Sequence, residues 1–498
     1  MSNKTHMHDN GESYSGLVPV KPSNKSGRPP AETVEGRTLT KENVGRPNPN
    51  WTPSQGNGSS GLDRVREAAR KNGKLRFTAL LHHVNVDLLR SSYFKLKKKA
   101  APGVDGVTWE EYGRELEAKL IDLHGRIHRG AYRAQPSRRV WISKTDGRQR
   151  PLGIAVLEDK IVQYAVTTVL NQIWEEDFLG FSYGFRPGRS QHDALDALYV
   201  GIMRKKVNWV LDLDVRSFFD KVDHDWMLRF AEHRIGDERI LRLIRKWLKA
   251  GVMEQDRWIE TEEGTPQGAV ISPVLANLYL HYVLDLWVVQ WRRRNARGDV
   301  IIVRYADDAV LGFQFRDEAE RFLQELKERT AKFGLELHPV KTRLIEFGRF
   351  AAERRKKRGE GSPETFSFLG FTHICGTSRQ TGYFTIIRKT ISKRRAAKLK
   401  QMHAELKQRL HDPLAETAKW LQSVVRGYFQ YHAIPGNERS LDQFRSPVLR
   451  SWLRQIRRRS QRSHWTWERF LERLGGLLPA VCTVHPYPTT RFDAKYPR

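Results

Sequence analysis

The sequence predicts an α/β or α+β core followed by an all-helical domain, and two observations support this prediction. Strand-like β-branched runs alternate with helical patterns in the middle of the chain, as at 207–215 and 316–333. From about residue 390 the pattern is helical, basic and aromatic. Residues 1–61 are rich in Gly, Pro, Ser and Asn. This segment cannot bury enough apolar surface to order itself and is predicted to be a disordered arm.

The elements of the core are expected in the following order. The first part contains helices at about 62–84 and 109–128, two short strands within 138–156 around a Lys-Thr-Asp-Gly-Arg turn, and an apolar helix at 157–175. The middle contains the strand at 207–215, helices within 224–250, a glycine-bounded turn leading into a long apolar helix at 264–294, and a hairpin at 299–315. The last part contains the helix at 316–333, a strand pair at 335–347 and a charged linker at 351–363.

The charge balance indicates a polyanionic partner. The 498 residues include 87 Lys and Arg against 57 Asp and Glu, which gives a net charge of +30. Nucleic acid is the usual partner of so basic a chain, and an acidic membrane surface is the competing interpretation. The basic segments do not form clean amphipathic helices, no run of 18 apolar residues occurs, and the N-terminus lacks an apolar signal. We therefore expect no membrane partner.

The cysteine content narrows the class of protein further. Only Cys375 and Cys482 are present, far apart in the sequence. Two cysteines exclude a disulfide framework and a four-cysteine zinc site, and they favour a reducing, cytoplasmic location.

Five aspartates predict a metal site. The strand at 207–215 supplies Asp212 and Asp214, Asp220 follows it, and the hairpin tip supplies Asp307 and Asp308. If the two strands are neighbours in one sheet, Asp214 and Asp307 converge, and carboxylates at that range repel unless a cation lies between them. Oxygen ligands favour Mg²⁺, and two such ions activate an attacking hydroxyl and stabilise a leaving pyrophosphate.

Each aspartate taken alone also has a structural interpretation, because Asp favours turns. An aspartate in an otherwise apolar strand is harder to explain in this way, since burying an unpaired charge is costly. Together, on a strongly basic chain, the aspartates favour phosphoryl transfer on nucleic acid. A nuclease remains an alternative on this evidence, because its metal site uses the same ligands.

Seven segments resemble, in the same order, the motifs of group II intron-encoded reverse transcriptases and maturases. The segments are KTDGRQRPLGI (144–154), SYGFRPGRSQHDAL (182–195), DLDVRSFF (212–219), GTPQGAVISPVLANLYL (264–280), YADD (305–308), GLELHPVKTRLIEF (334–347) and FSFLGF (366–371). The resemblance covers about 65–475. YADD alone recurs by chance, whereas seven segments in one order are specific.

The resemblance implies an α+β right-hand polymerase fold, in which helices back an antiparallel palm sheet. Fingers and palm would occupy 62–385, a helical thumb and maturase domain 386–475, and an extended basic tail 476–498. Many relatives carry a C-terminal endonuclease module with paired cysteines and histidines. Only Cys482, with His485 nearby, follows the helical domain here, so we expect that module to be absent.

The resemblance also implies roles for single residues. Asp214 and Asp307 resemble the principal ligands of two Mg²⁺ ions, with Asp308 beside them. Phe219 resembles an aromatic residue that crowds the 2′-hydroxyl of a nucleotide, although core packing is the alternative. The other candidates for nucleotide binding are Lys144 and Arg150 as cations for the triphosphate, Gln267 and Gly268 beside the nucleotide, and Lys341 near the primer or triphosphate.

The helical domain supplies candidates for RNA binding. The stretch VVRGYFQYH (424–432) resembles a characteristic maturase segment, and Arg426, Tyr428 and Tyr431 within it suit phosphate contact and base stacking. Packing in the domain's own core is an equal alternative for the two tyrosines. Arg454, Arg457 and Arg458 belong to a basic run that we expect to meet backbone phosphates.

The activity implied by the resemblance is RNA-directed DNA polymerisation. The implied partners are a group II intron RNA whose splicing the protein assists, a target DNA that primes copying during retrohoming, and deoxynucleoside triphosphates. A splicing-only maturase with a vestigial polymerase site is one alternative, and a domesticated reverse transcriptase in defence is another. The intact acidic residues argue against the first, and the maturase-like stretch argues against the second.

Overall fold

The computed structural model describes residues 61–143, 149–255, 257–265, 267–378, 380–459 and 464–497. The arm predicted at 1–61 lies outside them except for Gly61, which begins the first helix. The chain divides into two compact units. The first unit contains the described parts of 1–194, 213–311 and 316–343, and the second contains those of 195–212, 312–315 and 344–498.

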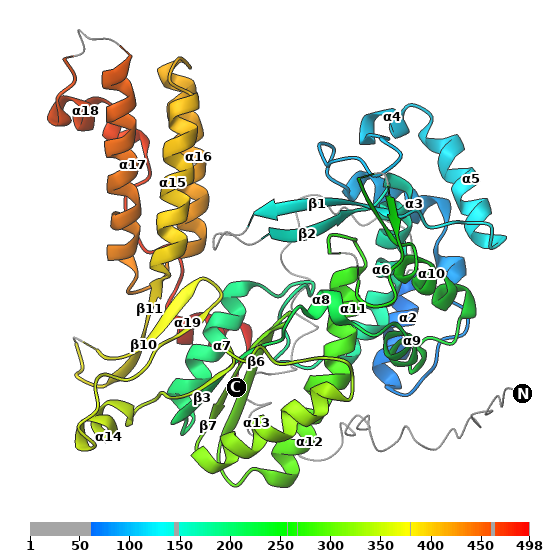
Figure 1. Ribbon diagram of the computed structural model, residues 1–498, viewed down its shortest axis with the longest axis horizontal. Helices are drawn as coiled ribbons and strands as arrows, with labels where there is room; N and C mark the ends of the chain where they lie inside the picture. The colour runs from blue at the N-terminus through cyan, green and yellow to red at the C-terminus, as the bar shows by residue number, and fades with distance from the viewer. Residues whose placement is uncertain are drawn as a thin grey trace, which may run out of the picture. The chain divides into compact units, whose positions relative to one another are not determined.

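Helices make up most of the first unit (Figure 1). They are α2 (Gly61–Lys71), α3 (Val86–Lys95), α4 (Trp109–Gly113), α5 (Leu116–His128), α6 (Leu157–Asp177), α8 (Phe218–Lys221), α9 (His224–Glu232), α10 (Glu238–Leu248), α11 (Ser272–Leu280), α12 (Leu286–Asn295) and α13 (Arg316–Ala331). Helix α6 lies at the centre of this packing, because it contacts α2, α3 and α11 and is apolar around most of its circumference. A short π-helical turn, His281–Asp285, joins α11 to α12.

A small sheet in the first unit has the strand order β2-β1-β4-β5. Its strands are β1 (Ser137–Ser143), β2 (Gln149–Ile154), β4 (Val252–Glu254) and β5 (Arg257–Ile259). The antiparallel β1/β2 pair confirms the strand pair predicted within 138–156, with Ile142 opposite Arg150 and Val140 opposite Leu152. Because side chains alternate along a strand, Arg150 and Leu152 point to the same face.

A second sheet has the order β6-β7-β3-β8 and carries the predicted aspartates. Its strands are β3 (Trp209–Asp214), β6 (Val300–Tyr305), β7 (Asp308–Phe313) and β8 (Arg343–Glu346). The prediction of a strand pair at 335–347 is wrong, because β8 is the only strand there and Leu337 forms just an isolated bridge with Val215. Pro339, which lacks a backbone N–H, lies between the two. The linker predicted at 351–363 contains helix α14 (Ala351–Lys357).

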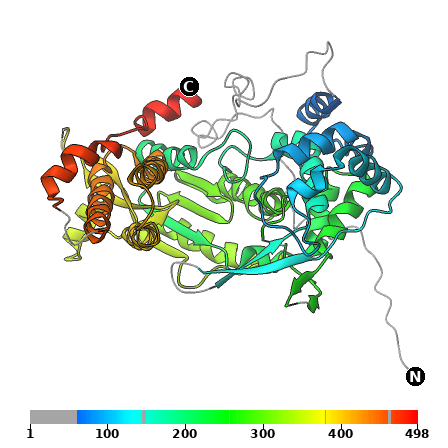
Figure 2. The same cartoon turned by 90° about the horizontal axis from the view of Figure 1, so that it is seen from above.

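The second unit combines an antiparallel sheet with a helical bundle. Its elements are the C-terminal part of α7 (Gln191–Arg204), the strands β9 (Phe366–Phe368), β10 (Phe371–Thr377) and β11 (Phe384–Thr390), and the helices α15 (Ser392–Gln408), α16 (Leu414–His432), α17 (Glu438–Arg458), α18 (Trp467–Leu474) and α19 (Pro488–Lys495). Helices α15, α16 and α17 run side by side and are seen nearly end-on in Figure 2. Met402, Leu421, Phe444 and Trp452 are among the buried residues that form the core of this bundle.

The boundaries of the units differ from those predicted. The segment 344–385, which was predicted to belong to the fingers and palm, lies in the second unit together with the helical bundle. Its strand β11 contacts α7 of the same unit: Arg388 Nη1 lies 3.4 Å from Asp196 Oδ1, and Tyr199 Oη lies 3.0 Å from Thr385 Oγ1.

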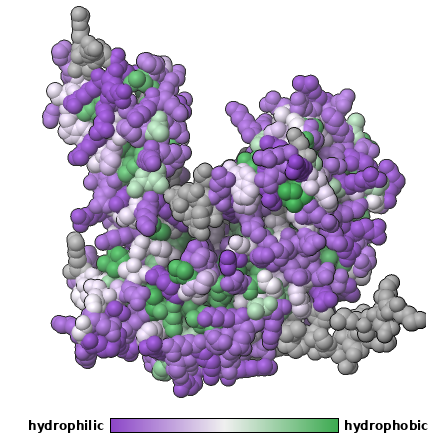
Figure 3. All heavy atoms as spheres, viewed as in Figure 1, coloured by the Kyte–Doolittle hydropathy of each residue, from purple (hydrophilic) through white to green (hydrophobic). Residues whose placement is uncertain are grey.

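Side chains on the viewed face of α15, α16 and α17 are mostly hydrophilic (Figure 3).

The tail predicted to be extended at 476–498 contains helix α19 instead. Pro488 begins this helix, a position at which the missing N–H of proline costs nothing. Arg204 donates two hydrogen bonds to Asp493, at 2.8 and 2.6 Å, and Arg491 pairs with the buried Asp196. These ion pairs fasten the tail to α7 within the second unit. Such long-range partners are not visible in the local composition.

No helix among the described residues is long and apolar enough to cross a membrane. Cys375 and Cys482 are both free thiols.

Candidate active site

A two-residue turn, Ala306 and Asp307, joins β6 to β7. A loop this short requires antiparallel strands, so the predicted hairpin is confirmed. Ala306 has a φ of 57°, in the left-handed region that non-glycine residues rarely adopt. Asp307 is half-buried in the turn, whereas Asp308 begins β7 and is exposed.

Asp214 ends β3, and the segment before β8 holds it in place. His338 N donates to the carbonyl of Asp214 at 2.8 Å, and Thr342 Oγ1 lies 3.2 Å from the same oxygen. The side-chain atom Oδ2 of Asp214 accepts a charge-assisted hydrogen bond from Lys341 Nζ at 2.8 Å. Lys341 was expected near the primer or triphosphate, and the structure places it on a predicted metal ligand.

The surroundings of Asp307 raise the pKa of its carboxyl group. Burial is the largest cause, and the negative charge of Asp214 acts in the same direction. A backbone hydrogen bond and the positive charges of Arg150 and Lys341 oppose the rise. Two carboxylates and two cations therefore interact at this place, although they come from four separate segments of the first unit.

This donor set fits a hard divalent cation such as Mg²⁺. Asp214 and Asp307 bring two repelling negative charges together, and the Lys341 ammonium marks a position at which positive charge is stabilised. Mg²⁺ commonly takes one or two carboxylates and completes its shell with water and substrate phosphates. Within the described residues no group of three or more His, Cys, Asp and Glu is arranged to hold a metal. Substrate and water oxygens would have to supply the remaining ligands.

Arg150 and Gln267 are brought together beside this centre. Arg150 Nε donates to Gln267 Oε1 at 2.6 Å, and Gln267 Nε2 donates to Asp220 Oδ1 at 2.9 Å. The backbone of β2 joins the same turn, because Gly153 N donates to Gln267 O at 2.6 Å. Lys144, the other predicted triphosphate cation, lies outside the described residues.

Position 268 requires a glycine because of its backbone conformation and its close contacts. Its φ is +112°, and a Cβ there would lie 2.8 Å from both Gly153 O and Leu152 Cδ1. The glycine therefore permits β2 to pack against the turn that carries Gln267.

Phe219 differs from its neighbour in exposure. The Phe218 ring is buried, and the Phe219 ring meets it edge-on at 5.3 Å but remains half-buried. Thr265 N fixes the backbone of Phe219 by donating to its carbonyl at 2.7 Å. The Phe219 side chain is thus partly accessible, unlike that of Phe218.

The candidate RNA-binding residues of the second unit divide into two groups. Arg426, Arg454, Arg457 and Arg458 are exposed. Tyr428 stacks on Phe444 with ring centroids 3.6 Å apart, and Tyr431 donates from its hydroxyl to Leu369 O at 2.6 Å. Both tyrosines therefore pack their own domain, which is the alternative that the sequence left open.

Two charged residues close to the Ala306–Asp307 turn were missed from the sequence. Arg304 and Asp285 are fully buried, and Arg304 Nη2 lies 2.6 Å from Asp285 Oδ2. Both stand in apolar surroundings, Arg304 in VIIVRY (300–305) and Asp285 in HYVLDLWVV (281–289). A charge within an apolar run requires a buried partner, and this signal could have identified the pair.

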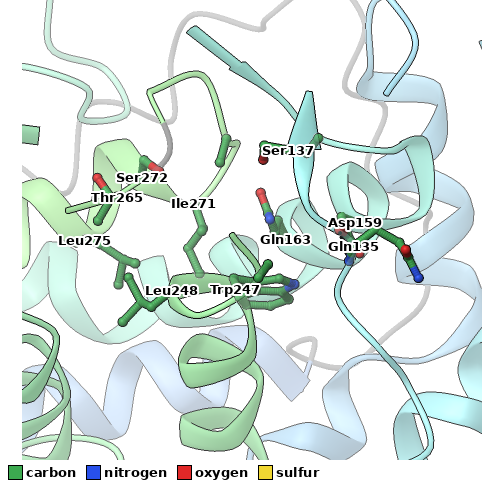
Figure 4. Close-up of a pocket in the computed structure, with 13 residues that line it drawn as sticks. Gln135, Ser137, Asp159, Gln163, Trp247, Leu248, Thr265, Ile271, Ser272 and Leu275 are labelled. Atoms are coloured by element: carbon green, nitrogen blue, oxygen red, sulfur yellow. Dashed lines mark hydrogen bonds between the residues drawn. The ribbon is translucent and has the colours of Figure 1, made fainter. Parts of the chain in front are cut away.

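Another buried polar cluster lies beside a small cavity (Figure 4). Asp159 accepts hydrogen bonds from the Tyr132 hydroxyl and from Gln135 N, and Trp247 Nε1 donates to Tyr132 Oη at 2.9 Å. Burial, the largest cause, raises the pKa of Asp159 to about 6. Gln163 and Ser137 line the same small cavity.

Known proteins resemble this chain over its central part. Residues 142–373 match the reverse transcriptase (RNA-dependent DNA polymerase) family. Protein YkfC of Escherichia coli (strain K12) is 36% identical over 256 residues, which cover 45% of this chain and 67% of YkfC. The group II intron-encoded protein LtrA of Lactococcus lactis subsp. cremoris is 32% identical over 293 residues, which cover 57% of this chain and 47% of LtrA.

A putative COX1/OXI3 intron 1 protein of Saccharomyces cerevisiae is 30% identical over 217 residues, which cover 43% of this chain and 26% of that protein. The matched region thus spans about two thirds of YkfC and about half of LtrA. The family match implies the right-hand polymerase fold, in agreement with the mixed helices and antiparallel sheets. The chain belongs to the group II intron-encoded reverse transcriptases and maturases, a family of RNA-directed DNA polymerases.

Proposed function

We propose that this chain copies its group II intron RNA into DNA by target-primed synthesis in the cytoplasm, and that it also assists splicing of that RNA. The observation that carries the proposal is the convergence of Asp214 and Asp307 with Arg150 and Lys341. Palm and fingers correspond to the first unit, and the thumb corresponds to the helical bundle of the second.

We assign different chemical roles to the individual residues of the site. Asp214 and Asp307 would hold two Mg²⁺ ions, with Asp308 as a further ligand. When bound, such ions would supply activation of the primer hydroxyl and charge stabilisation for the leaving pyrophosphate. Arg150, held by Gln267, offers its guanidinium to the triphosphate, where negative charge must be offset during transfer. Lys144 is proposed to act with it.

The nucleotide would be selected at Phe219, Gln267 and Gly268. The half-buried Phe219 ring suits a position against the sugar, where it would exclude a 2′-hydroxyl. Gly268 would support this position by letting β2, which carries Arg150, pack against the turn that carries Gln267. Lys341 holds Asp214 before substrate enters and would then turn toward the triphosphate.

Intron RNA would bind the basic surface of the helical bundle. Arg426, Arg454, Arg457 and Arg458 are exposed there and suit contact with phosphates. Tyr428 and Tyr431 would support this surface through their packing rather than by stacking on bases.

Primer extension on an RNA template with Mg²⁺ tests the proposal. Wild-type protein should extend a DNA primer, and Asp307→Ala should lose essentially all activity. Asp225→Ala is the matched control, because Asp225 is an exposed aspartate in the first turn of α9 and should be dispensable. Equal extension by wild type and Asp307→Ala would reject the site, and tight intron binding without any polymerisation would favour a splicing-only maturase.

A further inference from the structure

The side chain of Arg304 uses all of its hydrogen-bonding capacity inside the protein. A guanidinium has five N–H donors, and Arg304, which is fully buried in β6, makes five hydrogen bonds. Nε and Nη2 donate to the two carboxylate oxygens of Asp285 at 2.7 and 2.6 Å. Nη2 also donates to Ser182 Oγ at 2.7 Å, and Nη1 donates to Asn277 Oδ1 at 3.0 Å and to Ala306 O at 2.9 Å.

The bond to Ala306 reaches the catalytic turn. The carbonyl of Ala306 and the N–H of Asp307 belong to one planar peptide group. A donor on that carbonyl therefore fixes the orientation of the peptide that begins Asp307. This constraint matters because Ala306 lies at φ 57°, a conformation that persists only when its surroundings impose it.

The same network holds the turn from its other side. Gly184 packs so closely that a Cβ there would lie 2.2 Å from Ala306 N. Asn277, which accepts from Arg304, donates from Nδ2 to Gly184 O at 2.7 Å. Backbone bonds also join Arg304 N to Phe181 O at 2.9 Å and Tyr183 N to Arg304 O at 2.8 Å. Ala306 is thus held between Gly184 and the Arg304 guanidinium.

The counterion of Arg304 comes from an irregular piece of helix. Asp285 is the last residue of the π-helical turn between α11 and α12. Arg329 of α13 supports this turn by donating to Val283 O at 2.5 Å and to Tyr282 O at 3.0 Å. π-Helical turns are rare and occur frequently at functional sites. Here the turn directs a carboxylate at the residue that holds the catalytic hairpin.

We propose that Arg304 is a positioning residue for catalysis: it orients the Ala306–Asp307 peptide so that the Asp307 carboxylate faces Asp214. The inference rests on the proposed function, because it takes Asp307 as a metal ligand. A buried ion pair by itself is weak evidence for a stabilising role. The specific feature is the hydrogen bond from Arg304 to Ala306 O, because it reaches the catalytic turn and is not part of the Arg304–Asp285 ion pair.

The first test compares lysine substitutions at two buried arginines of the first unit. Arg304→Lys keeps the charge but cannot serve five acceptors in one plane. It should lower kcat about 100-fold and leave KM for the nucleotide within about twofold. Arg234→Lys is the matched control. Arg234 is also buried, with Nε 3.1 Å from Asp177, and donates to Asn72 O and Ala69 O but to no residue of the catalytic turn. It should lower the melting temperature similarly while kcat stays within about threefold of wild type.

The second test separates folding from positioning. Arg304→Met leaves the Asp285 charge buried without its partner, whereas the double variant Arg304→Met/Asp285→Leu removes both charges. The double variant should regain thermal stability relative to Arg304→Met, and its kcat should remain low because Ala306 O still lacks its donor. Recovery of kcat together with stability would overturn the proposal.

The outcomes for the two proposals are distinguishable. Active wild type, inactive Asp307→Ala, and an Arg304→Lys variant no slower than Arg234→Lys would reject the role of Arg304 alone. Absence of extension by wild type, or full activity of Asp307→Ala, would reject the catalytic site on which that role depends.

Discussion

The ammonium group of Lys341 lies 2.8 Å from Oδ2 of Asp214, a carboxylate that we propose as a metal ligand. The ion pair is partly open to solvent, with the lysine side chain 48% and the aspartate side chain 27% exposed. An exposed pair of this kind contributes about 0.2–1 kcal/mol. Its consequence for the site is competition, because a divalent ion bound at the same carboxylate would be repelled by the positive charge of Lys341.

Replacement of Lys341 by methionine should tighten metal binding in the absence of nucleotide. Loss of a competing ion pair worth up to about 1 kcal/mol corresponds to an increase of about 1.5- to 5-fold in affinity. Titration with Mn²⁺ followed by electron paramagnetic resonance measures the change. Lys221→Met, which removes the exposed pair of Lys221 with Glu263, is the control and should bind metal like wild type. Weaker binding by Lys341→Met would contradict competition.

Gly268→Ala should raise KM for the nucleotide by more than a general loss of stability would explain. The new Cβ would meet Gly153 O and Leu152 Cδ1 at 2.8 Å and displace β2, which carries Arg150. We expect a rise of roughly tenfold or more in KM for the nucleotide, about 1.4 kcal/mol. Gly106→Ala is the control, because Gly106 also has a positive φ, +70°, but open space around its Cβ position. It should cost about 1 kcal/mol of stability and leave KM unchanged.

Asp159 should make the stability of the protein depend on pH. Its pKa is raised to about 6 from 3.8 in the folded state, so the folded protein binds a proton that the unfolded chain lacks between these values. Stability from this group therefore increases as pH falls from about 6 toward 4. The unfolding free energy of wild type minus that of Asp159→Asn should grow over this range, by an amount on the order of 1–3 kcal/mol. Urea unfolding at pH 7 and pH 5 measures it, and a difference that shrinks toward pH 5 would reject the shift.

The basic surface formed by α15 and α17 should contribute to RNA affinity through charge. The pKa of His403 is lowered by burial and by the neighbouring Lys407, Arg454 and Arg458, so these cations lie close together. Arg454→Gln/Arg458→Gln should weaken intron RNA binding and reduce the salt slope by about 0.7–0.9 per lost phosphate contact. Filter binding at several salt concentrations measures the slope.

Lys357→Gln is the control for that experiment, because Lys357 is exposed but already pairs with Glu353 at 2.7 Å. Its salt slope should match that of wild type. An unchanged slope in the double arginine variant would show that α17 is not part of the RNA-binding surface.

The sequence was most informative where short motifs determine local geometry. A hairpin with Asp307 in its turn follows from two apolar runs around YADD, and the strand that ends at Asp214 follows from the apolar run VNWVLDLDV. The pairing of Lys341 with Asp214 could not be predicted, because it depends on how the segment before β8 folds back onto β3. Tyr428 and Tyr431 show the same limit, since the letters in VVRGYFQYH do not say which rings pack inward.

The helix in the tail could not be predicted from the sequence either, and its contacts have a practical consequence for experiments on this protein. Helix α19 pairs Asp493 with Arg204 and Arg491 with the buried Asp196. Cleavage before Pro488 would leave Asp196 with Arg388 at 3.4 Å as its remaining ion-pair contact within the described residues. A protein shortened there would be less stable for reasons unrelated to RNA or metal, because a buried carboxylate would lose one of its partners. Each preparation should therefore be tested by limited proteolysis for an intact and protected tail before any loss of activity is interpreted.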